Sequence, residues 1–382
     1  MLVVLQLCGG NDALNTFIPY TDRRYRDARP VLAIADDRII KISDRIGLHP
    51  SMEPMKDLYE RGKFAFINNV GFPTLDRSHF RCRDVWQTGD ESTGAGTQGG
   101  RGWAARYAEL YLDTATSVTT FAVGPRSPLG LASRLVSGTT ITSPDVFEAS
   151  THLVLDPAVS PDHASYREAL LGIYQQPRVT SDLELIRARG SSAFESIELF
   201  KRLGPASMTP YPDTYLGRTF QLVARIAAAG IGTSIVWVTI DGFDTHGKQA
   251  QMHSRLLADV SSTLAGFQDD LAGRRLSDSV VVLAWSEFGR RVYENGALGT
   301  DHGKAGTVFL VGDRVKGGTF YGDVPDLADL DDGDLKTTID FRSVYWTLIQ
   351  DWFGRDPLPV LQRNYENVGF MRKPARPRAV RQ

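Results

Sequence analysis

The sequence predicts an α/β protein with a doubly wound, mostly parallel central sheet and helices on both faces. Short aliphatic and β-branched runs recur along the chain without polar alternation, which is typical of strands covered on both faces. Stretches with helical periodicity lie between them. With 382 residues the chain is long enough to bury a large core. We therefore expect a single domain over residues 1–382.

The individual elements follow from these patterns. Strand-like runs occupy residues 2–7, 64–70, 234–240, 279–285 and 307–311. Helix-like stretches occupy residues 51–61, 101–112, 182–202, 215–229, 249–272 and 341–353. Turn residues between β-formers predict a small hairpin at residues 315–322.

Residues 124–209 interrupt the alternation of strands and helices. The stretch is rich in serine, threonine and proline before a longer helical pattern begins. We interpret it as a helical and loop insertion, or a cap, over the sheet edge.

Composition excludes several classes of protein. A formal net charge of −2 provides no field that would hold a nucleic acid backbone. No apolar run approaches the roughly 20 residues that span a bilayer, so integral membrane association is not expected. Two cysteines are too few for a disulfide scaffold. No export signal is visible in these residues, and the oligomeric state is left open.

Three predicted strands each run into a carboxylate. Asp12 follows the first strand, Asp241 follows the strand ending at Ile240, and Glu287 follows the strand ending at Trp285. Each carboxylate alone could be a helix N-cap. Ligands bind at the carboxyl ends of strands in open α/β sheets, and carboxylates crowded there repel unless a cation or a proton intervenes.

Histidines strengthen the prediction of a metal site. His246 lies in a segment with Asp244, and His302 follows Asp301, both bounded by glycine. Imidazole nitrogen with carboxylate oxygen suits zinc, with manganese or iron as alternatives. An acidic neighbour can instead orient the imidazole, so each histidine alone is as well explained by a structural hydrogen bond.

Catalytic candidates lie in two further segments. Ser78 follows the strand 64–70 and could be a nucleophile, although an N-cap serine is the simpler explanation. Its neighbour His79 could act as a general acid or merely pack. Arg290 and Arg291 could clamp an anionic ester, or could simply begin a surface helix.

Together these motifs resemble the bacterial family catalogued as domain of unknown function fifteen-oh-one. The resemblance runs in order from Leu2 to about Gly369. It rests on these segments: Cys8 to Thr16, Gly47 to Pro50, Arg77 to Phe80, Gly242 to His246, Ser286 to Arg291, Gly299 to Gly303, Val315 to Gly318 and Thr338 to Arg342.

That family is similar to the alkaline-phosphatase-like and sulfatase-like superfamily, which implies an alkaline-phosphatase-like fold and a two-metal ester-cleaving site. By this resemblance Asp12 and Ser78 match the first carboxylate and the nucleophile. Asp241 or Asp244 with His246, and His302, match later ligands; we favour Asp244 and leave Asp241 as a second ligand or a cap. The superfamily's adjacent Asp-His pair is Glu287-Phe288 here, so one nitrogen ligand is missing and a single metal is possible. Exported members are common in the family, which favours an exported location.

The leading hypothesis is a metal-dependent hydrolase of a small-molecule or saccharide anionic ester, with Ser78 or a metal-activated water as nucleophile. One or two divalent ions, zinc before manganese, iron or copper, would be held by the carboxylates and histidines. His79 or Asp301 would move protons, and Arg290 would balance substrate charge. Two alternatives remain, an iron or copper oxidoreductase on the same fold and a non-catalytic metal-binding or scaffold protein.

Overall fold

The computed structural model describes most of the chain in five continuous stretches. These are residues 1–92, 101–112, 118–133, 138–145 and 202–373, with a few isolated positions between 146 and 201. The predicted helix at 182–202 and most of the predicted insertion therefore lie outside the described residues.

The centre of the molecule is a nine-stranded sheet in the order β11-β5-β10-β9-β1-β8-β6-β7, with β12 beside β5. Its central strand β1 pairs in parallel with both β8 and β9. Only β10 runs antiparallel to its neighbours, β9 and β5. The predicted α/β class with a mostly parallel sheet is thus confirmed. The strands are β1 (Leu2–Leu7), β5 (Phe64–Gly71), β6 (Thr120–Val123), β7 (Gly138–Ile141), β8 (Ile235–Ile240), β9 (Val281–Trp285), β10 (Gly306–Val311), β11 (Thr319–Tyr321) and β12 (Ile339–Asp340).

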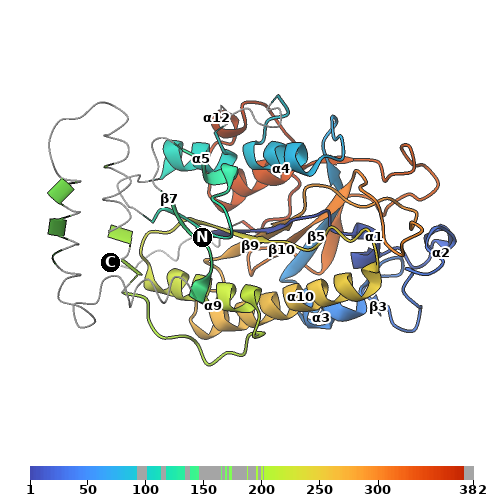
Figure 1. The fold of residues 1–382 in the computed structure, drawn as a ribbon, viewed down its shortest axis with the longest axis horizontal. Helices are drawn as coiled ribbons and strands as arrows, with labels where there is room; N and C mark the ends of the chain where they lie inside the picture. Colours follow the sequence, from blue (N-terminus) through green and yellow to red (C-terminus); the bar gives the residue numbers. More distant parts are fainter. Residues whose placement is uncertain are drawn as a thin grey trace.

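Helices cover both faces of this sheet (Figure 1). On one face lie α3 (Glu53–Glu60), α9 (Tyr215–Ala229) and α10 (Gln249–Gly273), and on the other α4 (His79–Thr88), α5 (Trp103–Tyr111) and α11 (Phe341–Thr347). The π-helical turn η3 (Leu348–Trp352) continues α11. The remaining short elements are α1 (Ala13–Thr16), β2 (Phe17–Ile18), α2 (Arg23–Ala28), β3 (Ile40–Lys41), β4 (Gly47–Leu48), η1 (Pro50–Met52), η2 (Leu129–Leu131) and α12 (Leu358–Leu361).

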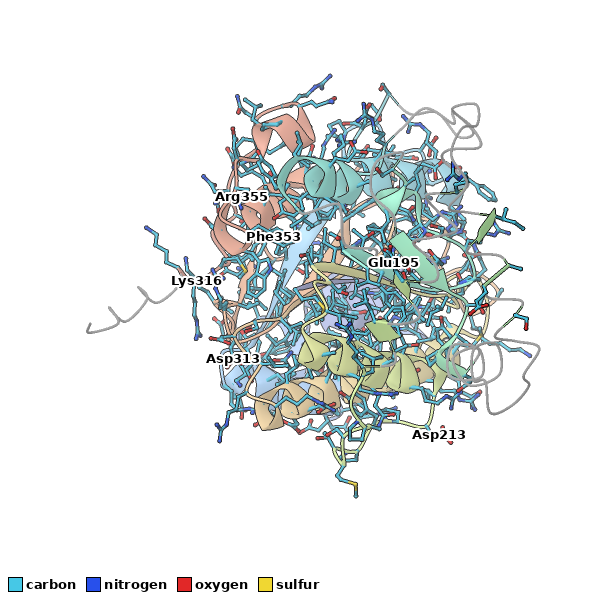
Figure 2. All side chains as sticks on the ribbon, turned by 90° about the vertical axis from the view of Figure 1, so that its left-hand side faces the viewer. Glu195, Asp213, Asp313, Lys316, Phe353 and Arg355 are labelled. Atoms are coloured by element: carbon cyan, nitrogen blue, oxygen red, sulfur yellow. The ribbon has the colours of Figure 1, made fainter. Side chains whose placement is uncertain are left out.

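Two apolar cores result from this layering. Along β1, Val3 and Leu5 pack into the core beneath α9 and α10, whereas Leu2 and Val4 pack into the core that contains Trp86. Successive strand residues point to opposite faces, so a strand buried on both faces must be apolar without alternation. Figure 2 shows Phe353 and Arg355 on the α11 side of the sheet and Asp213 beyond the opposite helix layer.

The predicted hairpin at 315–322 is wrong. Residues Thr319–Tyr321 form β11, which pairs in parallel with β5 rather than with a neighbouring strand of its own hairpin. The edge strand β7 lies inside the range predicted as an insertion and pairs in parallel with β6. In the described part of the chain, no helix has the length and apolar character needed to cross a membrane.

Candidate metal centre

The strand register brings three loops to one edge of the sheet. Leu7 is paired with Ile240 and Gln6 with Trp285, so the segments that follow β1, β8 and β9 leave the sheet side by side. Gly9 packs directly against the loop after β8: its φ is +120°, and a Cβ atom there would lie 2.2 Å from the backbone nitrogen of Asp244. Only glycine accepts both that conformation and that contact.

Three side chains from separate segments form a group that can hold a metal ion. His79 begins α4, Asp244 follows β8, and His302 precedes β10. One ligand atom from each lies within 4.8 Å of the other two. The His302 Nε2 atom is 3.1 Å from Asp244 Oδ1, and His79 Nε2 is 3.5 Å from Asp244 Oδ2.

His246 adds a third imidazole to this group. Its Nε2 atom lies 3.0 Å from Asp244 Oδ1 and 2.9 Å from His302 Nε2. We call His79, Asp244, His246 and His302 the metal cluster.

The Nδ1 atom of every imidazole in the metal cluster lies within hydrogen-bonding distance of an oxygen atom. The pairs are His79 with Glu287 at 2.8 Å, His246 with Asp301 at 3.2 Å, and His302 with the Arg77 carbonyl at 3.0 Å. An Nδ1–H that donates to such an oxygen leaves Nε2 as a lone pair directed at Asp244. This is the arrangement by which proteins orient histidine ligands.

The local electrostatics favour a cation between these groups. Partial burial alone would raise the pKa of Asp244, but the hydrogen bond from Arg290 and its positive charge oppose this effect and the pKa falls to about 2, so the carboxylate is charged. Burial lowers the pKa of His302, which keeps this imidazole neutral and able to ligate. Neutral nitrogen donors and one carboxylate are the ligand types of zinc and of first-row transition metals.

The spacing of the donor atoms also fits a metal ion. Ligands that are each about 2.0–2.1 Å from zinc in a tetrahedron lie about 3.3 Å from one another. The contacts among His246 Nε2, His302 Nε2 and Asp244 Oδ1 measure 2.9, 3.0 and 3.1 Å, close to that value, whereas His79 Nε2 lies 3.5 Å from the other carboxylate oxygen, Oδ2. In addition, the buried His79 Nε2 atom has no hydrogen-bond partner in the described part of the chain. A buried nitrogen without a partner is costly, and a bound cation would satisfy it.

Asp12 lies outside the metal cluster. Its Oδ2 atom accepts a hydrogen bond at 2.6 Å from Arg29, whose side chain is fully buried, and another from Gln249. Its Oδ1 atom caps α1 through the Asn15 amide. Although burial opposes ionisation, Arg29 holds the pKa of Asp12 below its usual value. Asp12 therefore neutralises a buried arginine in this structure.

Asp241 and Ser78 are near the cluster but are not part of it. Asp241 is exposed and lines a separate cavity with Cys8. Ser78 is the N-cap residue of α4, and its hydroxyl makes no capping hydrogen bond. In the described part of the chain, the Ser78 hydroxyl makes no hydrogen bond to the metal cluster, although Ser78 directly precedes His79.

The side chain of Arg290 is buried rather than open to a substrate. It donates to the carbonyls of Gly9, Gly10, Phe243 and Thr300, and to Asp244 Oδ1 at 2.6 Å. Arg290 thus ties together the three loops that carry the site. Arg291 lies outside the cluster and is within 3.4 Å of Asp332.

Sequence reasoning missed two features of this region. Arg29, the partner of Asp12, is an unremarkable position in an arginine-rich segment and carries no motif. The sequence offered His79 as a proton-transfer group or as an additional metal ligand beside Glu287, but it did not predict the hydrogen bond between His79 and Glu287, because the two residues lie far apart in the chain.

The fold and the cluster thus define an α/β protein with a candidate metal centre at the carboxyl ends of its strands. Residues 196–356 match the model of the family described as "Protein of unknown function (DUF1501)". This match confirms, over residues 196–356, the family resemblance predicted from the motifs. No curated protein matches the sequence.

Several solved structures resemble this chain in fold. The C-terminal periplasmic domain of EcEptC from Escherichia coli has 10% identity and a TM-score of 0.45, over 94% of this chain and 85% of that one. The PsFucS1 sulfatase from Pseudoalteromonas sp. has 9% identity and a TM-score of 0.41, over 97% and 73%. The alkaline phosphatase from the Antarctic bacterium TAB5 has 9% identity and a TM-score of 0.33, over 83% and 94%.

Proposed function

We propose that the protein is a metal-dependent hydrolase of an anionic ester, with one divalent cation, zinc in the first place, held by His79, Asp244, His246 and His302. The observation that carries this proposal is the convergence of three imidazole Nε2 atoms on one carboxylate, each imidazole being held by an oxygen at Nδ1. A structural role alone would not require three rings aimed at one acidic group.

The chemistry of the site follows from these side chains. When bound, a divalent cation polarises the ester and makes an attacking water more acidic. Asp244 supplies the negative charge, and Arg290 fixes its position through the 2.6 Å contact. Asp301 lies beside His246 on the exposed side, where it accepts from the His246 Nδ1–H and is itself held by the Asn295 side chain, so Asp301 orients this imidazole.

One cation is favoured over two because two further carboxylates at this edge, those of Asp12 and Glu287, already have partners within the protein. Asp12 is paired with Arg29, and Glu287 accepts hydrogen bonds from the Gly9 amide and pairs with His79. A second cation would have to displace the buried guanidinium of Arg29. We therefore propose that Arg29 supplies the positive charge at the position where a two-metal enzyme would hold its second ion.

Elemental analysis of protein purified without added metal tests the identity and number of the ions. We expect about one zinc per chain and hydrolysis of an aryl phosphate or an aryl sulfate ester that a chelator abolishes. Stoichiometric iron or copper without hydrolysis would contradict the proposal and support the oxidoreductase alternative, which the nitrogen-rich ligand set also suits. A full complement of zinc without turnover of either ester would support a non-catalytic role.

Replacing Ser78 with alanine tests the identity of the nucleophile. Because the Ser78 hydroxyl makes no hydrogen bond to the metal cluster in the described part of the chain, we propose that water is the nucleophile and expect kcat to stay within about threefold of wild type. Ser279→Ala, at the opposite end of β9, is the matched control. A loss of a hundredfold or more in Ser78→Ala alone would instead assign the attack to the serine.

Replacing Glu287 with glutamine tests the support behind His79. The carboxylate accepts from His79 Nδ1 at 2.8 Å and from the Gly9 amide at 2.9 Å, and it is almost fully buried. Loss of such an outer partner typically costs about 10- to 100-fold in metal affinity. We expect that loss in competition titrations with a chelating dye, whereas the exposed control Glu53→Gln should bind like wild type. Unchanged affinity in Glu287→Gln would remove His79 from the ligand set.

A further inference from the structure

A cavity of about 470 Å³ lies at the same edge of the sheet as the metal cluster. Its walls come from the ends of β1 and β8, from α4, and from the segment after β6. Its polar lining includes Gln6, Arg83, Asp84, Gln87, Arg126 and Asp241. The volume falls within the range of small-molecule sites, and its position is the usual one for ligands of α/β sheets.

Two connections make this cavity a neighbour of the metal cluster. Arg83 is four residues after His79 on α4, so the two side chains share one face of the helix. On the other side, Asp241 precedes Asp244 in the same loop, which is fastened to β1 by the Phe243 amide donating to the Cys8 carbonyl at 3.1 Å. A ligand in the cavity would therefore lie beside whatever is bound at the cluster.

The cavity offers two arginines that are not neutralised by ion pairs. In the described part of the chain, no carboxylate lies within ion-pairing distance of Arg83 or Arg126, whereas Arg29 and Arg290 both have such partners. The Arg83 guanidinium lies over the exposed ring of Phe80, 5.5 Å from its centroid. Unpaired guanidinium groups bordering a concave site are suited to carboxylate, sulfate or phosphate.

The remaining polar groups of the cavity suit hydroxyls. Asp84 and Asp241 have no ion pair in the described part of the chain and can accept hydrogen bonds. Behind them, Gln6 and Gln87 are buried and fixed: Gln6 Oε1 accepts from Gln87 at 2.8 Å and from Trp237 at 3.1 Å, and Gln87 Oε1 accepts from the Gly130 amide. The wall is thus rigid and polar before any ligand binds.

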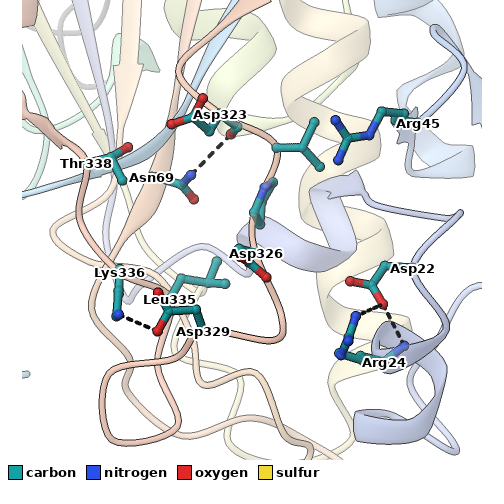
Figure 3. A pocket seen from close by; sticks show the side chains of 12 residues that line it. Asp22, Arg24, Arg45, Asn69, Asp323, Asp326, Asp329, Leu335, Lys336 and Thr338 are labelled. Atoms are coloured by element: carbon teal, nitrogen blue, oxygen red, sulfur yellow. Dashed lines mark hydrogen bonds and ion pairs between the residues drawn. The ribbon is translucent and has the colours of Figure 1, made fainter.

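A second cavity, of about 530 Å³, has a different character (Figure 3). Its acidic side chains outnumber its basic ones, and several of its charges are already satisfied internally. Asp22 pairs with Arg24, and Asp329 pairs with Lys336. It is therefore the poorer candidate for an anion.

We propose that the cavity bordered by Arg83 and Arg126 is a substrate subsite that binds a hydroxylated anion of monosaccharide size, such as a sugar acid. The two guanidinium groups bind the anionic group, and Asp84 and Asp241 accept from the hydroxyls. The role of this subsite in turnover rests on the proposed hydrolase function, because the ester to be cleaved would lie at the metal cluster. Binding of the anion does not depend on that function.

Calorimetric titration of glucuronate and of glucose into the metal-free full-length protein tests the subsite apart from catalysis. We expect glucuronate to bind, with at least tenfold weaker binding of neutral glucose. Arg83→Gln and Arg126→Gln should each weaken glucuronate binding about tenfold, as expected for loss of a charged hydrogen bond. The control Arg23→Gln removes an exposed arginine that pairs with Asp27 at the surface, and should leave glucuronate binding unchanged.

The possible results separate the subsite from the hydrolase. Equal binding of glucose and glucuronate, no binding of glucuronate, or wild-type affinity in both cavity variants would overturn the subsite. Arginine-dependent binding in a protein that hydrolyses no ester would retain the subsite and reject the hydrolase function instead.

Discussion

The His302→Ala variant is expected to lose its bound cation, and its rate of ester hydrolysis is expected to fall by at least about a hundredfold. A bound cation stabilises the charge of the transition state by several kcal/mol, which corresponds to a rate factor of that size. His302 is held at both of its ring nitrogens. Its Nδ1 atom faces the Arg77 carbonyl, and its Nε2 atom lies close to both Asp244 and His246. Elemental analysis after dialysis and initial rates with an aryl ester measure the two losses.

The control for this variant is Lys304→Ala, two residues further along the same loop. Lys304 pairs with Asp331 outside the cluster, so its removal should leave metal content and rate unchanged. In the presence of a chelator, His302→Ala and wild type should have the same melting temperature. A His302→Ala protein that keeps one tightly bound cation per chain would show that the cluster is not the metal site.

The central strands could be predicted from the sequence because a strand that is buried on both faces consists of consecutive apolar residues. The run 2–7 is strand β1 with its predicted bounds, and 215–229 is helix α9 with its predicted bounds. The direction of a strand relative to its neighbours has no comparable signal in the sequence. Nothing in the apolar run at 307–311 indicates that β10 runs antiparallel to its neighbours β5 and β9. The turn residues around Gly317 likewise favour a hairpin, although β11 pairs with β5.

For the site, likewise, the sequence pattern predicted where the residues lie along the strands, whereas tertiary packing determines which of their side chains meet. Strand ends and glycine-bounded histidines indicated the sheet edge at which Asp244, His246 and His302 meet. Asp12 reaches that edge as well, but its side chain turns to Arg29. The direction in which a carboxylate points depends on a partner outside its own motif, and the spacing of residues within the motif does not predict that partner.

Substituting Asp12 with asparagine is expected to destabilise the protein by about 3–5 kcal/mol, the usual cost of leaving one member of a buried ion pair without its partner. The side chains of Asp12 and Arg29 are 1% and 0% exposed. The amide of asparagine keeps the size of the side chain but removes the charge that balances Arg29. Urea unfolding with an unchanged m-value measures this loss, and the exposed control Asp27→Asn should lose no more than about 1 kcal/mol.

A double replacement, Asp12→Asn with Arg29→Met, separates the stability of the pair from metal binding. Removing both charges removes the unbalanced guanidinium, so part of the lost stability should return. If Asp12 serves only to balance Arg29, the refolded double variant should still bind one cation at the metal cluster, measured by titration with zinc. Loss of zinc binding in the folded double variant would mean that Asp12 or the charge of Arg29 acts on the cation itself. In that event, the assignment of Arg29 to the place of a second metal ion would be the first part of the proposal to fail.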